Sequence, residues 1–142
     1  MSAPASLQIR SDFAELTRLA SWIDAWARQE CVPDQTAQTV DLCAAEAVTN
    51  VMTHGLAGAE GAQIELRLGR EGDHVVLQIE DPGVEFDPTQ APPPAPVTLE
   101  SDKVGGWGIG IVRRLSDEVR YTRVGGRNRL TLVFHPRPSA AA

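Results

Sequence analysis

The sequence predicts an α+β fold, a two-layer sandwich in which helices cover one face of a mixed, mostly antiparallel sheet. Before Gly55, apolar residues recur every three or four positions, which is typical of amphipathic helices. After Gln63 they alternate with polar residues, which indicates half-buried strands. Short turns join these strands in pairs, so a single sheet covered by one helical layer is the economical packing. This order of elements argues against a doubly wound Rossmann sheet.

The first half of the chain predicts one short strand and two helices. The strand covers residues 6–10, and Ser11 follows as the expected N-cap of a helix that ends near Gln29. The apolar stripe of this helix consists of Phe13, Leu16, Leu19, Ala20, Ile23, Trp26 and Ala27. Pro33 restarts the chain, and a second helical stripe continues until Gly55 stops it. The second stripe consists of Ala37, Val40, Ala44, Ala47, Val48 and Val51.

The second half predicts two hairpins, separated by a long loop and a short helix. Strands are expected at 63–68, 75–80, 118–123 and 129–134. The loop covers residues 81–106 and has no apolar periodicity, and a lid is expected within it at about 87–104. A loop of this length inside a compact domain is more often functional than not. The short helix follows from about Gly108 to Ser116.

Length and composition indicate one domain over residues 1–142, with a core at about 6–135 and a disordered tail at 136–142. The formal net charge of −6 disfavours nucleic acid and anionic membranes as partners, because an acidic surface repels phosphate groups. No run of about 18 apolar residues suggests a membrane span. Since no signal peptide is recognised either, a cytoplasmic location is expected.

Cys31 and Cys43 lack CxxC spacing, and buried, reduced thiols are expected.

Glu46 and Asn50 lie four residues apart in the second predicted helix, so they share one face. An amide oxygen is a hard ligand that suits Mg²⁺, which binds together with nucleotide phosphates. A carboxylate one turn earlier could orient or deprotonate an attacking hydroxyl group. The structural alternative is a solvated pair on the helix surface.

The tripeptide from Asp81 to Gly83 directly follows a predicted strand. A carboxylate at that place can accept a hydrogen bond from an exocyclic amine, such as that of adenine. Gly83 would let the backbone approach a flat ring closely. A plain turn is the alternative. Phe86 speaks against it, because a loop rarely contains a Phe that packs against nothing.

The glycine-rich run Gly105–Gly110 opens the short helix. Glycines remove side-chain bulk, and backbone N–H groups at a helix N-terminus attract phosphate. The run is not a P-loop, because no Gly-Lys-Ser/Thr ends it, and it is not a Rossmann fingerprint, because it follows a long loop. Helix packing alone is the alternative explanation.

The order of these motifs is more specific than any one of them. It is a helix with Glu46 and Asn50, a hairpin, a strand ending in Asp81, a lid, and then the glycine run before a helix. This order resembles the GHKL ATPase superfamily, whose fold is the Bergerat fold, over residues 6–135. Within it the chain is most similar to the anti-sigma factor serine/threonine-protein kinases. That similarity rests on the stretches 46–55, 116–119 and 126–132.

The resemblance implies a role for each candidate residue. It implies that Asn50 holds Mg²⁺, that Glu46 is the catalytic base, and that Asp81 and Gly83 recognise the adenine of ATP. Thr131 is a further candidate beside the adenine. The candidates at the phosphates are Gly106, Gly108 and Gly110, together with Lys103 in the lid.

The resemblance also implies a function. The protein would bind ATP and Mg²⁺, phosphorylate a serine on a STAS-type anti-anti-sigma protein, and sequester a sigma factor. A homodimer is a further expectation. A nucleotide-gated protein-interaction module without kinase activity is the main alternative. The detached catalytic domain of a two-component sensor is another, but no histidine-bearing dimerisation segment is seen in these 142 residues.

Overall fold

A computed structural model of the protein describes residues 4–56, 59, 61–90 and 107–136. In chain order the main elements are β1 (Ala5–Arg10), α1 (Leu16–Gln29), α2 (Asp34–Asn50), β2 (Gln63–Glu71), β3 (His74–Asp81), α3 (Trp107–Leu115), β4 (Glu118–Val124) and β5 (Arg127–Phe134). Three short helical turns lie between them, at Phe13–Glu15, Val51–Gly55 and Pro88–Gln90. No described helix is long and apolar enough to cross a membrane.

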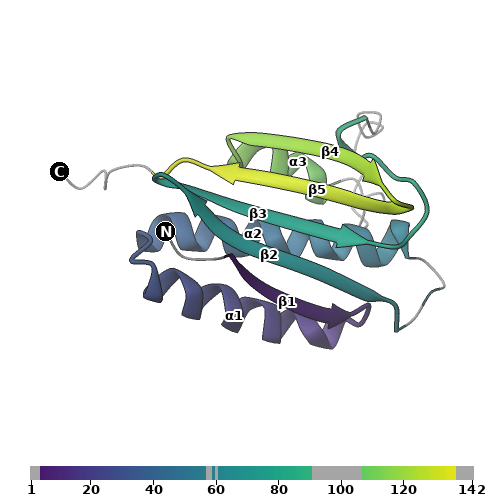
Figure 1. Ribbon diagram of the computed structural model, residues 1–142, viewed down its shortest axis with the longest axis horizontal. Coiled ribbons are helices and arrows are strands. Elements are labelled where there is room, and N and C mark those ends of the chain that lie inside the picture. Colours follow the sequence, from purple (N-terminus) through teal and green to yellow (C-terminus); the bar gives the residue numbers. More distant parts are fainter. Residues whose placement is uncertain (1–3, 57–58, 60, 91–106, 137–142) are drawn as a thin grey trace, which may run out of the picture.

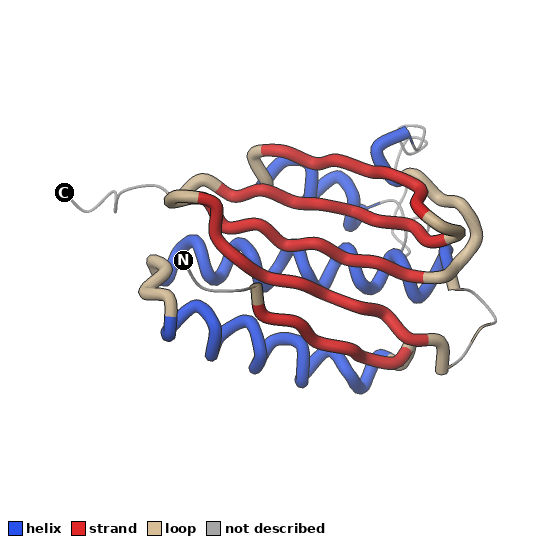
Figure 2. The backbone as a smooth tube through the Cα atoms, viewed as in Figure 1, coloured by secondary structure: helices blue, strands red, loops and turns tan. Residues whose placement is uncertain are grey.

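The five strands form one sheet in the order β1-β2-β3-β5-β4, and every pairing is antiparallel (Figure 1). The three α-helices all lie on the same face of this sheet (Figure 2). The predicted α+β sandwich is therefore confirmed. The pairing of β3 with β5 does not follow chain order, because β5 lies between β3 and β4 in the sheet.

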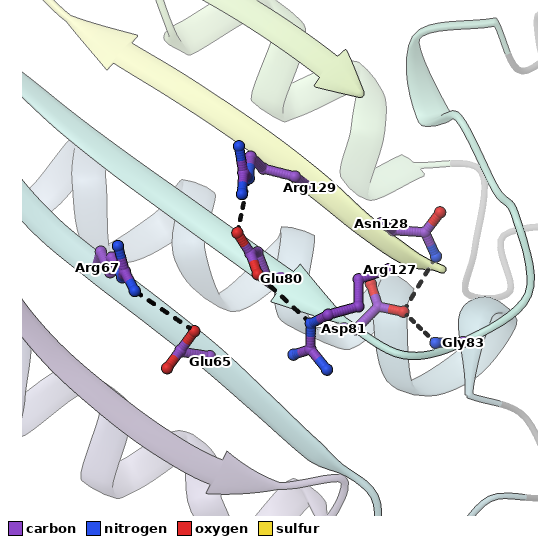
Figure 3. Close-up of polar contacts among 8 residues, drawn as sticks. All are labelled: Glu65, Arg67, Glu80, Asp81, Gly83, Arg127, Asn128 and Arg129. Carbon is purple, nitrogen blue, oxygen red and sulfur yellow. Dashed lines mark hydrogen bonds and ion pairs between the residues drawn. The ribbon is translucent and has the colours of Figure 1, made fainter. Parts of the chain in front are cut away.

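The core lies between the sheet and the helices. Along β3 the residues alternate between buried and half-buried, so Leu77, Ile79 and Asp81 point towards the helices. The other face of the sheet is polar and carries ion pairs, for example between Glu80 and Arg129 at 2.6 Å (Figure 3). This is the pattern of an antiparallel sheet that is covered on one side only.

The start of the first helical segment differs from the prediction, whereas the end of the second agrees with it. Asp12, rather than Ser11, caps the first helical turn, because its carboxylate accepts a hydrogen bond from the backbone N–H of Ala14 at 2.9 Å. The second helix continues past Asn50 as a π-helical turn that ends at Gly55, where the sequence predicted the stop.

Two further predictions concern thiols and loops. Cys43 is buried as expected, but Cys31 is exposed, because it follows α1 in the connection to α2. Most of the predicted lid and nearly all of the predicted tail lie outside the described residues. The described beginning of the lid is not structureless. It forms the turn Pro88–Gln90, which Asp87 stabilises by accepting a hydrogen bond from the backbone N–H of Thr89.

Candidate functional site

A pocket lies where α2 and β3 end and β5 begins. Its lining is mostly apolar and contains a few polar groups, which is the composition typical of small-molecule sites. The lining residues are Ala47, Asn50, Val51, Gly55, Ile79, Asp81, Phe86, Pro88, Tyr121, Asn128 and Leu130. Asn50 and Asp81 are 31 residues apart in sequence (81 − 50), and the fold brings them into one cavity.

Asp81 is the carboxylate of this pocket, and only 3% of it is exposed. Its Oδ1 atom accepts hydrogen bonds from the backbone N–H of Gly83 at 2.8 Å and from the Asn128 amide at 3.1 Å (Figure 3). None of the residues that the structure describes donates a hydrogen bond to Oδ2. The carboxylate is therefore held through one oxygen, and the other can accept a hydrogen bond from a ligand.

Gly83 allows the segment after β3 to touch the turn after α2. A Cβ atom at residue 83 would lie 2.1 Å from the carbonyl oxygen of Gly55 and 2.8 Å from Asp81 Oδ1. Both distances are far below contact distance, so a side chain would force the two backbones apart. The backbone N–H of Val84 also donates a hydrogen bond to Gly55 O at 3.2 Å, which adds to this close approach.

Phe86 forms part of the pocket wall. Its ring stacks on the ring of His54, with centroids 5.6 Å apart and an angle of 28° between the planes. Arg123 donates a hydrogen bond to the carbonyl oxygen of Gly83 at 2.8 Å and so holds the start of the same segment. Asp81 to Phe86 is therefore a fixed part of the site rather than a plain turn.

Asn50 enters the pocket from the last turn of α2, and 7% of it is exposed. Its amide makes no hydrogen bond to another residue within the described ranges. The side chain lines the pocket, so a ligand or an ion in the pocket can bind the amide. Glu46 lies one turn earlier and is half-buried. The negative charge of Glu46 acts on Cys43, whose pKa is raised to about 12, first by burial and then by this charge.

The described part of the glycine run, residues 107–110, forms the N-terminal end of α3. Gly108 and Gly110 belong to the first turn of this helix. The other end of α3, at Arg114 and Leu115, shares a surface groove with Gln35 at the start of α2, so the two helices run in opposite directions. The glycine end of α3 therefore lies towards the C-terminal end of α2, where Asn50 is (Figure 2).

Comparison with known proteins assigns the chain to a family, because residues 9–134 match the histidine kinase-like ATPase domain. The chain belongs to this family of ATPase domains. A histidine kinase-like ATPase domain uses ATP, so the pocket at Asp81 lies in a nucleotide-dependent protein.

Curated relatives of this histidine kinase-like ATPase domain are named as protein kinases. The serine/threonine-protein kinase BtrW of Bordetella bronchiseptica is 33% identical over 120 residues, which are 84% of each chain. The serine-protein kinase RsbW of Oceanobacillus iheyensis is 27% identical over 93 residues, which are 61% of this chain and 58% of RsbW. The prediction that the protein is a protein kinase is thereby supported.

Solved structures have the same fold. The crystal structure of the RsbU and RsbW domains of Rv1364c from Mycobacterium tuberculosis superposes with a TM-score of 0.68 at 17% identity. It covers 97% of this chain, but the chain spans only 34% of that structure. The blue-light activated histidine kinase EL346 of Erythrobacter litoralis gives a TM-score of 0.54 at 22% identity, over 87% of this chain and 41% of that kinase.

Among the predicted site residues of this histidine kinase-like ATPase domain, the structure brings Asn50, Asp81 and Gly83 together. Gly106 and Lys103 lie outside the described residues.

Thr131 does not join the pocket, and its predicted place beside the base is corrected. Along β5 the residues Asn128, Leu130 and Leu132 are buried towards the helices, whereas Thr131 alternates with them and pairs with Gln78 on the polar face. The sheet therefore separates Thr131 from the pocket.

The sequence reasoning assigned no role to Asn128, which lines the pocket and contacts Asp81. One pattern in the sequence could have indicated it. Asn128 lies two positions before Leu130 and four before Leu132. Since side chains two residues apart in a strand share one face, Asn128 occupies an inward position.

Proposed function

We propose that this histidine kinase-like ATPase domain is a protein-serine kinase that uses ATP with Mg²⁺. Its substrate would be a serine on a STAS-type anti-anti-sigma protein, and it would also sequester a sigma factor. The observation that carries the proposal is the buried Asp81, whose Oδ2 faces no donor within the described part of the chain. The names of BtrW and RsbW support serine as the acceptor. The partner classes follow from the resemblance to anti-sigma factor serine kinases.

In this proposal Asp81 recognises the base. Its Oδ2 accepts a hydrogen bond from the exocyclic amine of adenine, and the apolar lining, which includes Val51 and Leu130, contacts the faces of the ring. A charged acceptor in a buried pocket discriminates strongly, because a base that lacks the amine leaves the carboxylate unpaired.

Asn50 would hold Mg²⁺, and the chemistry of its side chain fits this role. The residue is 7% exposed, and its side chain lies at the pocket and has no hydrogen-bond partner among the described residues. When bound, the ion would neutralise charge on the transferred phosphoryl group. The backbone N–H groups in the first turn of α3, at Gly108 and Gly110, would attract the phosphates.

Glu46 would act as the general base. The serine hydroxyl of the partner attacks the γ-phosphorus, a new O–P bond forms, and the bond to the β-phosphate oxygen breaks to release ADP. The hydroxyl proton passes to the Glu46 carboxylate. Glu46 lies one helical turn before Asn50 on the same side of α2, which supports this role.

Transfer of label from [γ-³²P]ATP to a purified STAS protein encoded next to this chain's gene tests the proposal. We expect wild type to label the STAS protein and Glu46→Gln to be slower by about 10²–10⁴-fold, the scale of general-base catalysis. Glu65→Gln is the matched control, because Glu65 lies on β2 and pairs with Arg67 on the polar face. It should transfer label like wild type.

Two outcomes would contradict the kinase proposal. Equal labelling by wild type and Glu46→Gln would remove Glu46 from the chemistry. ATP binding without any transfer to a serine would instead identify a nucleotide-gated interaction module.

A further inference from the structure

Asn128 is the second residue of β5 and is buried, with 5% of it exposed. It lies directly opposite Asp81 in the pairing of β3 with β5. Figure 3 shows its amide pointing towards Asp81 from the neighbouring strand. A buried amide at this place must satisfy two donors and one acceptor group locally, because water is excluded.

The Asn128 amide nitrogen uses both of its hydrogens. It donates one hydrogen bond to Asp81 Oδ1 at 3.1 Å and one to the carbonyl oxygen of Val84 at 2.8 Å. Both partners are acceptors only, so they can be matched by the NH₂ group and not by the amide oxygen.

The Asn128 amide oxygen accepts three hydrogen bonds. Two come from the backbone N–H of Phe86 at 3.2 Å and from the Arg123 guanidinium at 3.1 Å, and the third comes from the hydroxyl of Tyr121. The Phe86 N–H and the guanidinium can only donate. The orientation of the amide is therefore determined from both sides, and a flipped amide would leave several buried groups unpaired.

The hydrogen bonds of Asn128 help to fix the orientation of the Asp81 carboxylate. The carboxylate oxygen Oδ1 is occupied by Gly83 N–H and by the Asn128 amide, so the carboxylate cannot rotate without breaking both bonds. The same amide holds the backbone at Val84 and Phe86, which carries the wall of the pocket. One side chain thus sets the direction of Oδ2 and the position of the wall that faces it.

We propose that Asn128 is a positioning residue that makes the pocket select a base with an exocyclic amine. It acts by orienting Asp81 Oδ2 towards that amine. The inference rests on the proposed function, because it needs a purine nucleotide in this pocket. Shorter hydroxyl side chains cannot span from Asp81 to Phe86, and a carboxylate at residue 128 would face Asp81 with a like charge.

Calorimetric binding of two nucleotides tests the proposal. ATP is compared with purine riboside 5′-triphosphate, which lacks the 6-amino group but keeps the ring, ribose and phosphates. We expect wild type to bind ATP more tightly by about 10–100-fold, the range for losing a hydrogen bond to a charged group. In Asn128→Ala this preference should shrink to about threefold or less, because Asp81 then keeps only the hydrogen bond from the Gly83 N–H and its carboxylate can turn about that bond.

The ratio separates positioning from a merely structural role. If Asn128 only supports the fold, both nucleotides weaken equally in Asn128→Ala and the preference stays, which would overturn the inference. Thr131→Ala is the control on the same strand, since its side chain lies on the opposite face. It should keep the wild-type ratio, and a loss of preference in Thr131→Ala would also overturn the inference.

Asn128→Asp provides a second test that keeps the size of the side chain. At pH 8 the two facing carboxylates repel, so we expect the preference for ATP to be low. At pH 5.5 a protonated carboxyl at residue 128 can donate to Asp81 Oδ1, and the preference should recover by about 3–10-fold, within the effect of one hydrogen bond. The wild-type ratio should change little over this range, and a variant ratio that does not change with pH would overturn the inference.

A different set of binding results would contradict the proposed function itself. Wild type that binds neither nucleotide would overturn the proposed function and the inference with it. Wild type that binds both nucleotides equally would remove Asp81 from base recognition, and it would overturn the inference while leaving nucleotide binding in place.

Discussion

Asp81 combines two properties, burial and a carboxylate oxygen, Oδ2, to which none of the described residues donates a hydrogen bond. Burial excludes competing water, and hydrogen bonds from Gly83 and Asn128 hold the group through its other oxygen. A buried polar group is costly unless it is hydrogen-bonded, and the two donors meet this requirement at Oδ1.

We expect Asp81→Asn to weaken ATP binding by about 1–3 kcal/mol, because a neutral amide replaces a charged acceptor at a buried donor. Calorimetry measures the loss. Glu80→Gln is a matched control one residue earlier, on the polar face, where Glu80 pairs with Arg127 and Arg129. Unchanged affinity in Asp81→Asn, or an equal loss in Glu80→Gln, would place the base elsewhere.

The helices α1 and α2 meet across a pair of carboxyl groups. Asp41 of α2 has a pKa raised to about 7, first by burial and then by its hydrogen bond to Asp24 of α1 and the charge of that residue. The Oδ1 atom of Asp41 is buried and has no hydrogen-bond partner in the described part of the chain. The contact between the two helices is therefore best satisfied when one proton is bound.

The sign of the pH dependence follows from this shift. In the unfolded chain the Asp41 carboxyl titrates near pH 4, so the folded state binds its proton more tightly. The contribution of Asp41 to the free energy of unfolding therefore falls as the pH rises from about 4 to 7, and it stays low above pH 7. Melting curves at pH 5 and pH 8 measure it.

We expect Asp41→Asn to raise the melting temperature at pH 8 by about 2–5 °C, the scale of ~1 kcal/mol in a domain of this size. At pH 5 the variant should gain less, because Asp41 of wild type is then protonated. Glu71→Gln on the exposed end of β2 is the control. A gain for Asp41→Asn that is the same at both pH values would show that its charge does not act on folding.

The first turn of α3 offers a test of the phosphate end. A Cβ atom at Gly110 would meet nothing within 4 Å among the described residues. We expect Gly110→Ala to stabilise the fold by about 0.5–1 kcal/mol through helix propensity. If Gly110 borders the phosphates, the same change should weaken ATP binding. Thermal melting and calorimetry on one preparation separate the two effects, and an unchanged affinity would move the phosphates away from Gly110.

On the scale of the whole molecule, the site lies at one end of the sheet, where segments from both halves of the chain meet (Figure 1). A ligand that joins the end of α2 with β3 and β5 should therefore stabilise the entire domain. By mass action, a ligand at about 100 times its dissociation constant adds ~2.7 kcal/mol.

We expect ATP with Mg²⁺ at that concentration to raise the melting temperature by about 5–10 °C. EDTA in excess over Mg²⁺ should remove most of the increase, because the phosphates would lose their counter-ion at Asn50. EDTA without nucleotide is the control and should change nothing. An increase that survives EDTA would argue against metal-assisted binding.

Much of the fold could be predicted because it depends on short-range patterns. The period of the apolar residues identified both long helices and the hairpin of β2 with β3. It could not identify the cap of the helical turn Phe13–Glu15 that precedes α1, since Ser11 and Asp12 are both good capping residues and only the geometry of the turn selects Asp12. The position of Asp81 at the end of a strand and before Gly83 was predictable, because the end of an alternating apolar pattern before a glycine is a local signal.

The sequence alone determined which segments are helices and strands, and it put Glu46 and Asn50 on one helix and Asp81 at the end of a strand. Only the tertiary structure decided that β5 lies between β3 and β4 and places Asn128 against Asp81, a residue 47 positions away. The same pairing turned Thr131 to the opposite face. The reason is physical. Local periodicity reports which residues share a face, but the partner of a strand is chosen by the packing of the whole core.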